Sequence, residues 1–350
     1  MQEKYRNLFK EILEKEISDL HLCVGLPPMV RKAESLMPLG NEKLQENDIR
    51  EILTSITPPA REIDFNNRGQ ELDFGVTVGN SARFRLNIYH DRNGICAALR
   101  QIPQKIKPLE TLGLPASVRK ACELQRGLVL VTGPTGSGKS TTLASIIDQI
   151  NNERQTHIIT LEDPIEYLHT HKRSVINQRE IGTDSKTFAQ ALRAALREDP
   201  DVILVGEMRD LETISNAVTA AETGHLVFGT LHTRSAAQSV SRVIDVFPAE
   251  QQAQIRIQFA EAINIVVSQN LVPSRDGDTR YLACEVMVAN TGIRNLIREN
   301  KTFQIKNMIE SGGREGMQTM DQSLHDLLDG AKISLRTARK YAFEKSYFSH

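Results

Sequence analysis

The segment GPTGSGKS at residues 133–140 constrains the fold of this chain more than any other part of its sequence. An apolar run with the composition of a β-strand precedes it, and a helix-compatible segment begins at Thr141. Its spacing matches the phosphate-binding loop G-x-x-x-x-G-K-[ST], which requires a strand before it and a helix after it. A glycine-rich turn can match this pattern by accident, but the flanking segments favour nucleotide binding.

The residues of this loop each have a chemical reason to be there. Glycines let backbone amides approach the phosphates without a clash from Cβ, and the N-terminus of the following helix adds partial positive charge. Lys139 is expected to reach the phosphates, and Ser140 to hold Mg²⁺. The predicted nucleotide-binding residues of the loop are Gly133, Pro134, Thr135, Gly136, Ser137, Gly138, Lys139, Ser140 and Thr141.

Length and charge limit the classes of protein that this chain can belong to. Its 350 residues suggest about two domains, and its formal net charge of −1 gives no support to a nucleic-acid surface or a polybasic membrane patch. No run approaches the roughly 18 apolar residues of a membrane span. We therefore predict a cytoplasmic protein that binds no nucleic acid and does not insert into a membrane.

The first part of the chain predicts a small α+β domain. Residues 1–20 carry apolar side chains at helical spacing between charges, and a second helix is expected around residues 48–55. Residues 71–100 alternate apolar and polar side chains around a turn that begins at Gly79, which predicts a β-hairpin with one buried face. The apolar positions are Leu8, Ile12, Leu13 and Ile17 in the first helix, and Leu72, Phe74, Val76, Val78, Phe84, Leu86 and Ile88 in the hairpin.

A proline-rich stretch separates this domain from the rest of the chain. Pro103, Pro108 and Pro115 interrupt the periodicity, which predicts an interdomain linker and a boundary near residue 108. The predicted domains are therefore residues 1–108, which include the linker, and residues 109–350.

Two arginines share the polar face of the predicted hairpin. Arg83 and Arg85 lie opposite Phe84 and Leu86. Periodicity alone favours an ordinary solvated strand face. The alternative is that both arginines reach the nucleotide of a neighbouring subunit as arginine fingers, which requires an oligomer.

The second part of the chain alternates strand-like and helical segments. The strand-like runs are GLVLVTG, THIITLEDP, DVILVGE and LVFGTLHT, and the helix between the last two carries Ile214, Val218 and Ala221 on one face. This alternation predicts an α/β fold with a mainly parallel sheet, in which ligands bind at the carboxyl ends of the strands. From about Asn290 the pattern becomes helical and polar, which predicts a C-terminal helical extension.

Acidic and histidine residues end several of these strands. Glu207 ends DVILVGE, where it could hold Mg²⁺ through water or polarise the attacking water. Glu166 is placed to act as a general base, whereas the nearby Asp163 is as consistent with a helix cap. His225 and His232 bracket a buried strand; a lone histidine there is usually a hydrogen-bonded core residue, but His232 could sense the γ-phosphate.

Four motifs in this order resemble the secretion ATPases of type II secretion and type IV pili. They are the Walker A motif GPTGSGKS, an Asp box ITLEDPIEY, a Walker B motif ILVGEMRD that ends its strand in Gly-Glu, and a His box GHLVFGTLHT. The resemblance implies an ATP-hydrolysing, hexameric motor with a RecA-like P-loop core at about residues 112–285, a PAS-like N-terminal domain and a helical extension at about 290–350. It also implies that Glu166 is the catalytic carboxylate, Glu207 the Walker B acid, and His225 and His232 functional His-box residues.

Within this family the chain is most similar to the type IV pilus retraction ATPases, the PilT group. The segment GIRNLIREN at residues 292–300 resembles their C-terminal retraction signature, although Gly292 replaces the usual alanine. The predicted motif residues are Ile293, Arg294, Asn295, Leu296, Ile297, Arg298 and Glu299. Ile293, Leu296 and Ile297 can dock one helix face, and Arg294 and Arg298 are expected to remain available for charged contacts.

The resemblance sets the expected partners and the alternatives. It implies ATP and Mg²⁺ as ligands, a homohexamer, an inner-membrane pilus platform protein, and a paralogous accessory retraction ATPase, with the motor held peripherally at the inner membrane. The alternatives are an extension or type II secretion ATPase, an accessory subunit without hydrolysis, and a DNA translocase. Extension motors look longer and carry an extra N-terminal domain and a four-cysteine metal element, neither of which is recognisable here.

Overall fold

The computed structural model describes residues 3–14, 17–32, 35–58, 63–65, 67–79, 82–102 and 105–348. It divides into two compact units. The first consists of Met1–Lys105 with two short segments from later in the chain, Asp163–Leu168 and Glu180–Asp184, and the second consists of Ile106–Glu162, His169–Arg179 and Ser185–His350. The chain passes from one unit to the other after Lys105, close to the proline-rich stretch, of which Pro103 lies outside the described residues.

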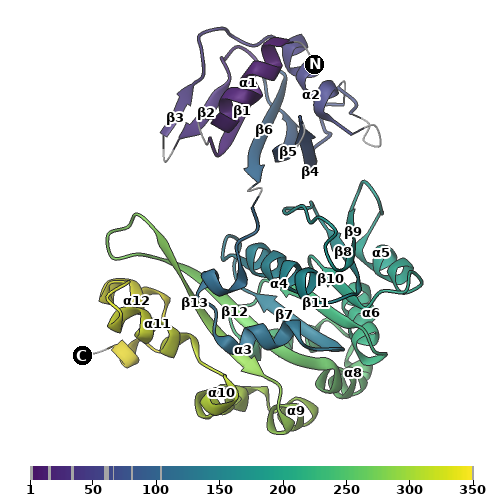
Figure 1. Ribbon diagram of the computed structural model, residues 1–350, viewed down its shortest axis with the longest axis vertical. Coiled ribbons are helices and arrows are strands. Elements are labelled where there is room, and N and C mark those ends of the chain that lie inside the picture. Colours follow the sequence, from purple (N-terminus) through teal and green to yellow (C-terminus); the bar gives the residue numbers. More distant parts are fainter. Residues whose placement is uncertain are drawn as a thin grey trace. The chain divides into compact units, whose positions relative to one another are not determined.

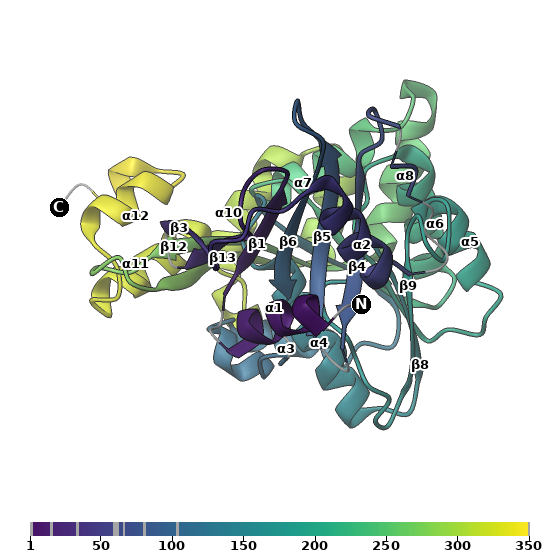
Figure 2. The same ribbon diagram turned by 90° about the horizontal axis from the view of Figure 1, so that it is seen from above.

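The first unit is built on a six-stranded sheet in the order β3-β2-β1-β6-β5-β4. Its elements are α1 (Glu3–Glu14), β1 (Asp19–Cys23), β2 (Met29–Lys32), β3 (Ser35–Pro38), α2 (Glu46–Ile56), β4 (Leu72–Val78), β5 (Ala82–His90) and β6 (Ile95–Ile102). Figure 2 shows α1 and α2 against this sheet. Apolar side chains of both helices share one core with one face of the strands, and the Phe9 and Phe84 rings meet edge to face at 5.7 Å.

The predicted elements of the first unit are largely confirmed. β4 and β5 pair as an antiparallel hairpin, and alternate residues of β5 are buried, so that Arg83 and Arg85 do share the other face. The predicted second helix is α2. The first helix ends at Glu14, so the prediction that Ile17 belongs to it is wrong, although Ile17 is buried in the same core. Asn80, in the predicted turn, lies outside the described residues.

The second unit is built on a seven-stranded sheet in the order β13-β12-β7-β11-β10-β8-β9. Strands β12, β7, β11, β10 and β8 run parallel, and β13 is antiparallel to β12. The strands are β7 (Gly127–Thr132), β8 (His157–Glu162), β9 (Val175–Glu180), β10 (Val202–Val205), β11 (Leu226–Leu231), β12 (Ile263–Pro273) and β13 (Arg280–Val288). Every residue of β7, β10 and β11 is buried, as expected for parallel strands covered on both faces, and the predicted α/β class is confirmed.

Helices cover this sheet and continue beyond it (Figure 1). They are α3 (Ala116–Arg119), α4 (Lys139–Glu153), α5 (Phe188–Ala195), α6 (Leu211–Glu222), α7 (Ala236–Asp245), α8 (Ala249–Ala262), α9 (Thr291–Arg298), α10 (Ile305–Ser311), α11 (Met320–Asp329) and α12 (Leu335–Tyr341). Short 3₁₀ turns occur at Leu109–Leu112, Lys120–Cys122, Thr302–Gln304, Gly313–Glu315 and Lys345–Phe348. Ile214, Val218 and Ala221 of α6 are buried, as predicted.

The chain after β13 is helical, as its sequence pattern predicts. α11 and α12 pack with the β12–β13 hairpin around a small separate core that includes Val272, Met320 and Leu324. Figure 1 shows these helices in yellow beside the hairpin. None of the helices in the described part of the chain combines the length and the apolar character needed to cross a membrane.

Candidate nucleotide site

The backbone of the loop between β7 and α4 is shaped by its glycines. Gly133 has a φ of 141°, and a Cβ atom on it would lie 2.3 Å from the carbonyl oxygen of Gln269. Gly136 has a φ of 78°, a conformation that L-residues rarely adopt. Any other residue at either position would strain the loop, so the two glycines are required by its shape.

Lys139 is the first residue of α4, and its side chain lies back over the loop. Its Nζ donates hydrogen bonds to the carbonyl oxygens of Gly133, at 2.9 Å, and Pro134, at 3.1 Å. Ser137 is buried, and its hydroxyl has no hydrogen-bond partner among the described residues. A phosphate group would satisfy both side chains, because its oxygens accept hydrogen bonds from an ammonium group and a hydroxyl.

The other predicted loop residues surround these two. Pro134 is half-buried, and Thr135 and Gly136 are exposed. Ser140 and Thr141 lie in the first turn of α4 and are half-buried. Gly138 is the N-cap of α4, with a φ of 93°. The structure therefore gathers all nine predicted phosphate-loop residues in one loop and helix N-terminus.

A buried polar layer beneath the loop was not predicted from the sequence. The hydroxyls of Thr132 and Ser268 lie 2.8 Å apart, and Gln269 donates from Nε2 to the Thr142 hydroxyl at 2.8 Å. These contacts join β7, β12 and α4. Because unpaired polar groups are costly in a protein interior, this layer fixes the relative position of the elements that carry the loop. The sequence signal was present, as polar residues at buried strand positions, but their partners lie more than a hundred residues away.

Glu207 and His232 come together at the ends of two neighbouring parallel strands. Glu207 follows β10 and His232 follows β11, and His232 Nε2 lies 2.8 Å from Glu207 Oε1. The same carboxylate oxygen accepts a hydrogen bond from Arg209 Nε. The Glu207 side chain is only 18% exposed, whereas His232 is 47% exposed. The role of Arg209 was not predicted, although it stands in the same GEMRD segment.

The register of the sheet places this pair at the same edge as the phosphate loop. Leu231 pairs with Thr132, so His232 and Gly133 leave the sheet side by side, and the Gly133 amide donates to the Leu231 carbonyl at 3.2 Å. Gly206 donates from its amide to the Leu161 carbonyl at 2.7 Å. The Met208 amide donates to the Thr230 carbonyl at 3.1 Å, so β8 and β11 hold the backbone on either side of Glu207.

His225 lies at the other edge of the sheet. It precedes β11, whose six residues separate it from His232 by about 20 Å. Its Nδ1 lies 3.1 Å from the Ala220 carbonyl oxygen, and its amide donates to the same oxygen, also at 3.1 Å. Within one subunit, the geometry argues against the predicted catalytic role of His225. It favours a structural role at the C-terminal end of α6.

Glu166, Arg83 and Arg85 belong to the first unit. Arg85 pairs with Asp73 at 2.5 Å, and this hydrogen bond raises the pKa of the Arg85 guanidinium, with smaller contributions from the charges of Glu166 and Asp163. Glu166 is half-buried. Arg85 is therefore electrostatically linked to the predicted catalytic carboxylate, which periodicity could not reveal.

Arg83 has a different environment from Arg85. Its Nη2 donates to Glu180 at 2.8 Å, and its side chain is 14% exposed, against 43% for Arg85. Glu180 also accepts the amides of Gly75 and Ile165, each at 3.1 Å. In this conformation Arg83 is held inside its own chain, and Arg85 is the more accessible of the two.

The predicted retraction motif forms α9. Ile293 and Ile297 are fully buried, and Leu296 is half-buried, as its helical spacing predicts. A Cβ atom on Gly292 would lie 2.8 Å from Cε of Met308, the flexible end of a side chain. The apolar residues of the motif therefore pack α9 against its neighbours. Of the seven motif residues, only Asn295 and Glu299 are exposed.

Of the two arginines predicted to remain available for charged contacts, Arg294 is occupied by backbone carbonyl groups, and Arg298 makes a charged contact within the chain. Arg294 donates to the carbonyl oxygens of Ala260 and Glu261 at the end of α8 and to Asn264 Oδ1 at 3.0 Å, and burial lowers its pKa. Arg298 donates to Glu261 Oε1 at 2.6 Å. Free carbonyl groups at a helix C-terminus attract cationic donors, which accounts for the position of Arg294.

Comparison with known proteins agrees with this arrangement. Residues 67–326 match the family described as "Type II/IV secretion system protein". The "Type IV pilus retractation ATPase PilT" of Pseudomonas aeruginosa is 48% identical over 325 residues, 93% of this chain and 94% of that protein. A "Twitching motility protein" of Neisseria gonorrhoeae is 48% identical over 315 residues, 90% of this chain and 84% of that protein.

A solved structure shares the whole fold. The "Crystal Structure of the Pilus Retraction Motor PilT and Bound ADP" matches with a TM-score of 0.90 and 45% identity, and the match covers 97% of each chain. The agreement therefore extends over both units.

Proposed function

The chain belongs to the family of type II/IV secretion system proteins, and from this premise we infer that it is an ATPase motor that powers type IV pilus retraction. The process served is twitching motility. The structural observation that carries the ATPase assignment is the Glu207–His232 contact at the strand edge that also bears the phosphate loop. An acid and a histidine beside a phosphate cradle can respond to the γ-phosphate.

The loop between β7 and α4 supplies the groups that would bind the phosphates of the nucleotide. Amides of residues 133–138 and the first turn of α4 would surround the β- and γ-phosphates, and Lys139 would exchange its contacts with the Gly133 and Pro134 carbonyls for phosphate oxygens. The buried Ser137 hydroxyl would gain an acceptor. Each change replaces an internal or absent hydrogen bond with a charge-assisted one, which favours the bound state.

The residues also fit Mg²⁺. The Ser140 hydroxyl and, through a water molecule, the Glu207 carboxylate are oxygen ligands of the kind that Mg²⁺ prefers. The ion would neutralise charge on the phosphate oxygens. His232 and Arg209 hold the Glu207 carboxylate from the protein side, so its orientation is set before nucleotide binds.

Glu166 is proposed as the general base that aligns the attacking water. The charge of Glu166 contributes to the raised pKa of Arg85, so these two predicted site residues of the first unit belong to one charged cluster. We also propose that Arg85, and Arg83 after release from Glu180, contact the nucleotide of a neighbouring subunit. His225 is not assigned a role in catalysis.

We propose a homohexamer in which ATP binding draws domains of neighbouring subunits together and product release separates them. The proposed partner is an inner-membrane pilus platform protein, which would hold the motor at the membrane, and a paralogous retraction ATPase is proposed as an accessory. Asn295, exposed on α9, and Glu299, the exposed C-cap of that helix, are the motif residues best placed to contact a partner.

The amount of surface pilin in the host tests the direction of the motor. Deletion of the gene is expected to leave excess pili, which the wild type but not Glu207→Gln returns to the normal level. Loss of pili in the deletion strain would instead establish an extension motor. Stimulation of hydrolysis by single-stranded DNA would favour a translocase, and absence of turnover in the purified wild-type hexamer would favour an accessory subunit.

A further inference from the structure

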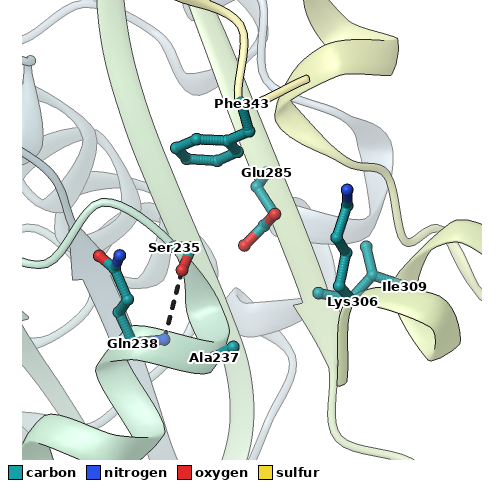
Figure 3. A pocket seen from close by; sticks show the side chains of 7 residues that line it. All are labelled: Ser235, Ala237, Gln238, Glu285, Lys306, Ile309 and Phe343. Carbon is teal, nitrogen blue, oxygen red and sulfur yellow. Dashed lines mark hydrogen bonds between the residues drawn. The ribbon is translucent and has the colours of Figure 1, made fainter. Parts of the chain in front are cut away.

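A pocket of about 210 Å³ lies in the second unit, between the start of α7 and the C-terminal helices. Its lining residues are Ser235, Ala237, Gln238, Glu285, Lys306, Ile309 and Phe343. Figure 3 shows the Glu285 carboxylate between Ser235 and Gln238 on one side and Lys306 and Ile309 on the other, with the Phe343 ring close by. None of these residues takes part in the nucleotide site described above.

Glu285 is the unusual residue of this pocket. It lies on β13 and is only 4% exposed. One of its carboxylate oxygens accepts the Ala236 amide at 2.7 Å. No lysine, arginine or histidine of the described residues forms an ion pair with it, although a buried carboxylate ordinarily has a cationic partner. Burial, with a smaller contribution from the charge of Asp321, raises the pKa of Glu285 to about 7.

The nearby ammonium group of Lys306 is already paired. It donates to Glu344 and lies 3.7 Å from Glu310, and the hydrogen bond to Glu344 raises its pKa. Asp321 is buried and accepts the amides of Phe343 and Glu344. The charged groups around the pocket are thus four carboxylates and one lysine. The charge of Lys306 lowers the Glu285 pKa only as a minor contribution, and its ammonium group is paired with Glu344, so the carboxylates outnumber the cations.

The remaining walls suit one kind of cation. Phe343 is 42% exposed and presents an aromatic ring, Ala237 and Ile309 are apolar, and Ser235 and Gln238 offer a hydroxyl and an amide. A guanidinium group is planar, weakly hydrated, donates in several directions to a carboxylate and stacks on aromatic rings. Its methylene stem can lie along apolar walls.

We propose that this pocket binds the guanidinium group of an arginine side chain presented by a protein partner. The carboxylate of Glu285 would accept two of its N–H groups, and Phe343 would cover its face. The occupant would contact Ser235, three residues after His232 in the chain. Binding itself does not depend on the proposed motor function; only an effect of the occupant on ATP turnover would.

The test uses the purified full-length protein and blocked amino acids as probes. N-acetyl-arginine methylamide is titrated by calorimetry beside its neutral isostere, N-acetyl-citrulline methylamide. We expect saturable binding of the arginine compound, at least about tenfold tighter than the citrulline compound. Absence of saturable binding, or equal binding of both compounds, would overturn the proposal.

Variants of the pocket residues test whether the arginine compound binds in this pocket. Glu285→Gln keeps the shape of the side chain and its acceptor for the Ala236 amide, and it is expected to weaken binding at least about tenfold. Glu250→Gln, an equal change of charge on the exposed start of α8, should leave binding unchanged. If Glu285→Gln does not fold, Phe343→Leu replaces it and should weaken binding about threefold. Binding that neither pocket variant weakens would place the cation elsewhere and refute this site.

Two further comparisons test whether the arginine comes from a protein or is a free metabolite, and whether binding depends on the charge of Glu285. Free arginine carries an extra carboxylate beside an acidic pocket, so tighter binding of free arginine than of the blocked compound would indicate a metabolite instead of a protein partner. Affinity should rise from about pH 6 to about pH 8 as Glu285 ionises, while Lys306 stays charged. Affinity that falls over this range would exclude Glu285 as the acceptor.

Discussion

The Nε2 atom of His232 lies 2.8 Å from Oε1 of Glu207, and this contact joins the ends of β11 and β10 beside the phosphate loop. Both residues leave buried strands whose backbones are fixed by neighbouring strands. A change in charge at Glu207 would therefore act first on His232, whose backbone neighbour Leu231 pairs with Thr132 before the phosphate loop.

Glu207→Gln is expected to bind ATP with near wild-type affinity but to lower turnover by about 10²- to 10⁴-fold. The amide keeps the size of the side chain but cannot act as the anionic partner of Mg²⁺ and water. Turnover is measured by phosphate release, and affinity with a fluorescent nucleotide. Glu250→Gln, on the exposed start of α8, is the matched control, and near-normal hydrolysis in Glu207→Gln would refute the Walker B assignment.

The two histidines of the His box should behave differently. His232→Asn is expected to reduce ATP turnover at least about tenfold without loss of stability, because its ring contacts Glu207 and is half exposed. His225→Ala removes the ring contact to the Ala220 carbonyl, which is expected to cost about 1 kcal/mol of stability while turnover per folded protein is retained. Phosphate release and thermal unfolding on both variants check this. Lost turnover in stable His225→Ala would show that this residue serves the site, for example across a subunit interface.

Arg294→Gln should destabilise the protein much more than Arg298→Gln. Arg294 occupies the carbonyl groups of Ala260 and Glu261 at the end of α8, and their loss is expected to cost about 2–3 kcal/mol. The Arg298–Glu261 pair is partly exposed, at 33% and 57%, and is expected to contribute less than about 1 kcal/mol. Urea unfolding of both variants measures the difference, and equal stabilities would contradict the helix-capping role of Arg294.

Stability should depend on pH through Glu285. Its pKa is raised to about 7 in the folded protein, so the folded state holds a proton that the unfolded state releases at lower pH. This contribution to stability is complete below the ordinary glutamate pKa and is lost as pH rises through about 7. Relative to the wild type, Glu285→Gln should therefore gain up to about 3 kcal/mol between about pH 4 and pH 8. Urea unfolding across this range tests it; a constant difference would mean that Glu285 has an ordinary pKa.

Glu180→Ala is expected to lower the free energy of unfolding by about 3–5 kcal/mol, because it leaves the Arg83 guanidinium largely buried without its carboxylate. Asp73→Ala, which frees Arg85, should cost less than about 1 kcal/mol, because that pair is about 40% exposed. Denaturant unfolding compares the two. Similar losses in both variants would show that Arg83 is not held more firmly than Arg85.

Local patterns predicted much of this molecule. A period of two identified the β4–β5 hairpin, a helical period identified α2 and α6, and the glycines and lysine of residues 133–140 identified the phosphate loop. These patterns predict local structure correctly because they arise from the backbone geometry of single helices and strands. The convergence of Glu207 and His232 was also predictable, because parallel strands bring their carboxyl ends to one edge.

What could not be predicted depends on residues far apart in the chain. The local pattern predicted Arg294 to face solvent, because its partners at the end of α8 lie more than thirty residues earlier and do not contribute to that pattern. The burial of Glu180 against Arg83 likewise depends on a segment that joins the first unit from the second half of the chain. His225 and His232 looked equivalent, since composition does not say which end of a strand faces the ligand.

One strand, β12, contacts both the predicted retraction motif and the phosphate loop. Near its start Asn264 accepts a hydrogen bond from Arg294 of α9, and further along the Gln269 carbonyl oxygen occupies the space where a Cβ atom on Gly133 would lie. Four residues lie between Asn264 and Gln269, and the five steps along the extended chain span about 17 Å. From Ile265 to Ser268, β12 is paired with β7 on one side and with β13 on the other, which resists bending of this part of the strand. β12 therefore connects the phosphate loop and the predicted retraction motif through a single strand, so that a displacement of either one would load the same row of hydrogen bonds.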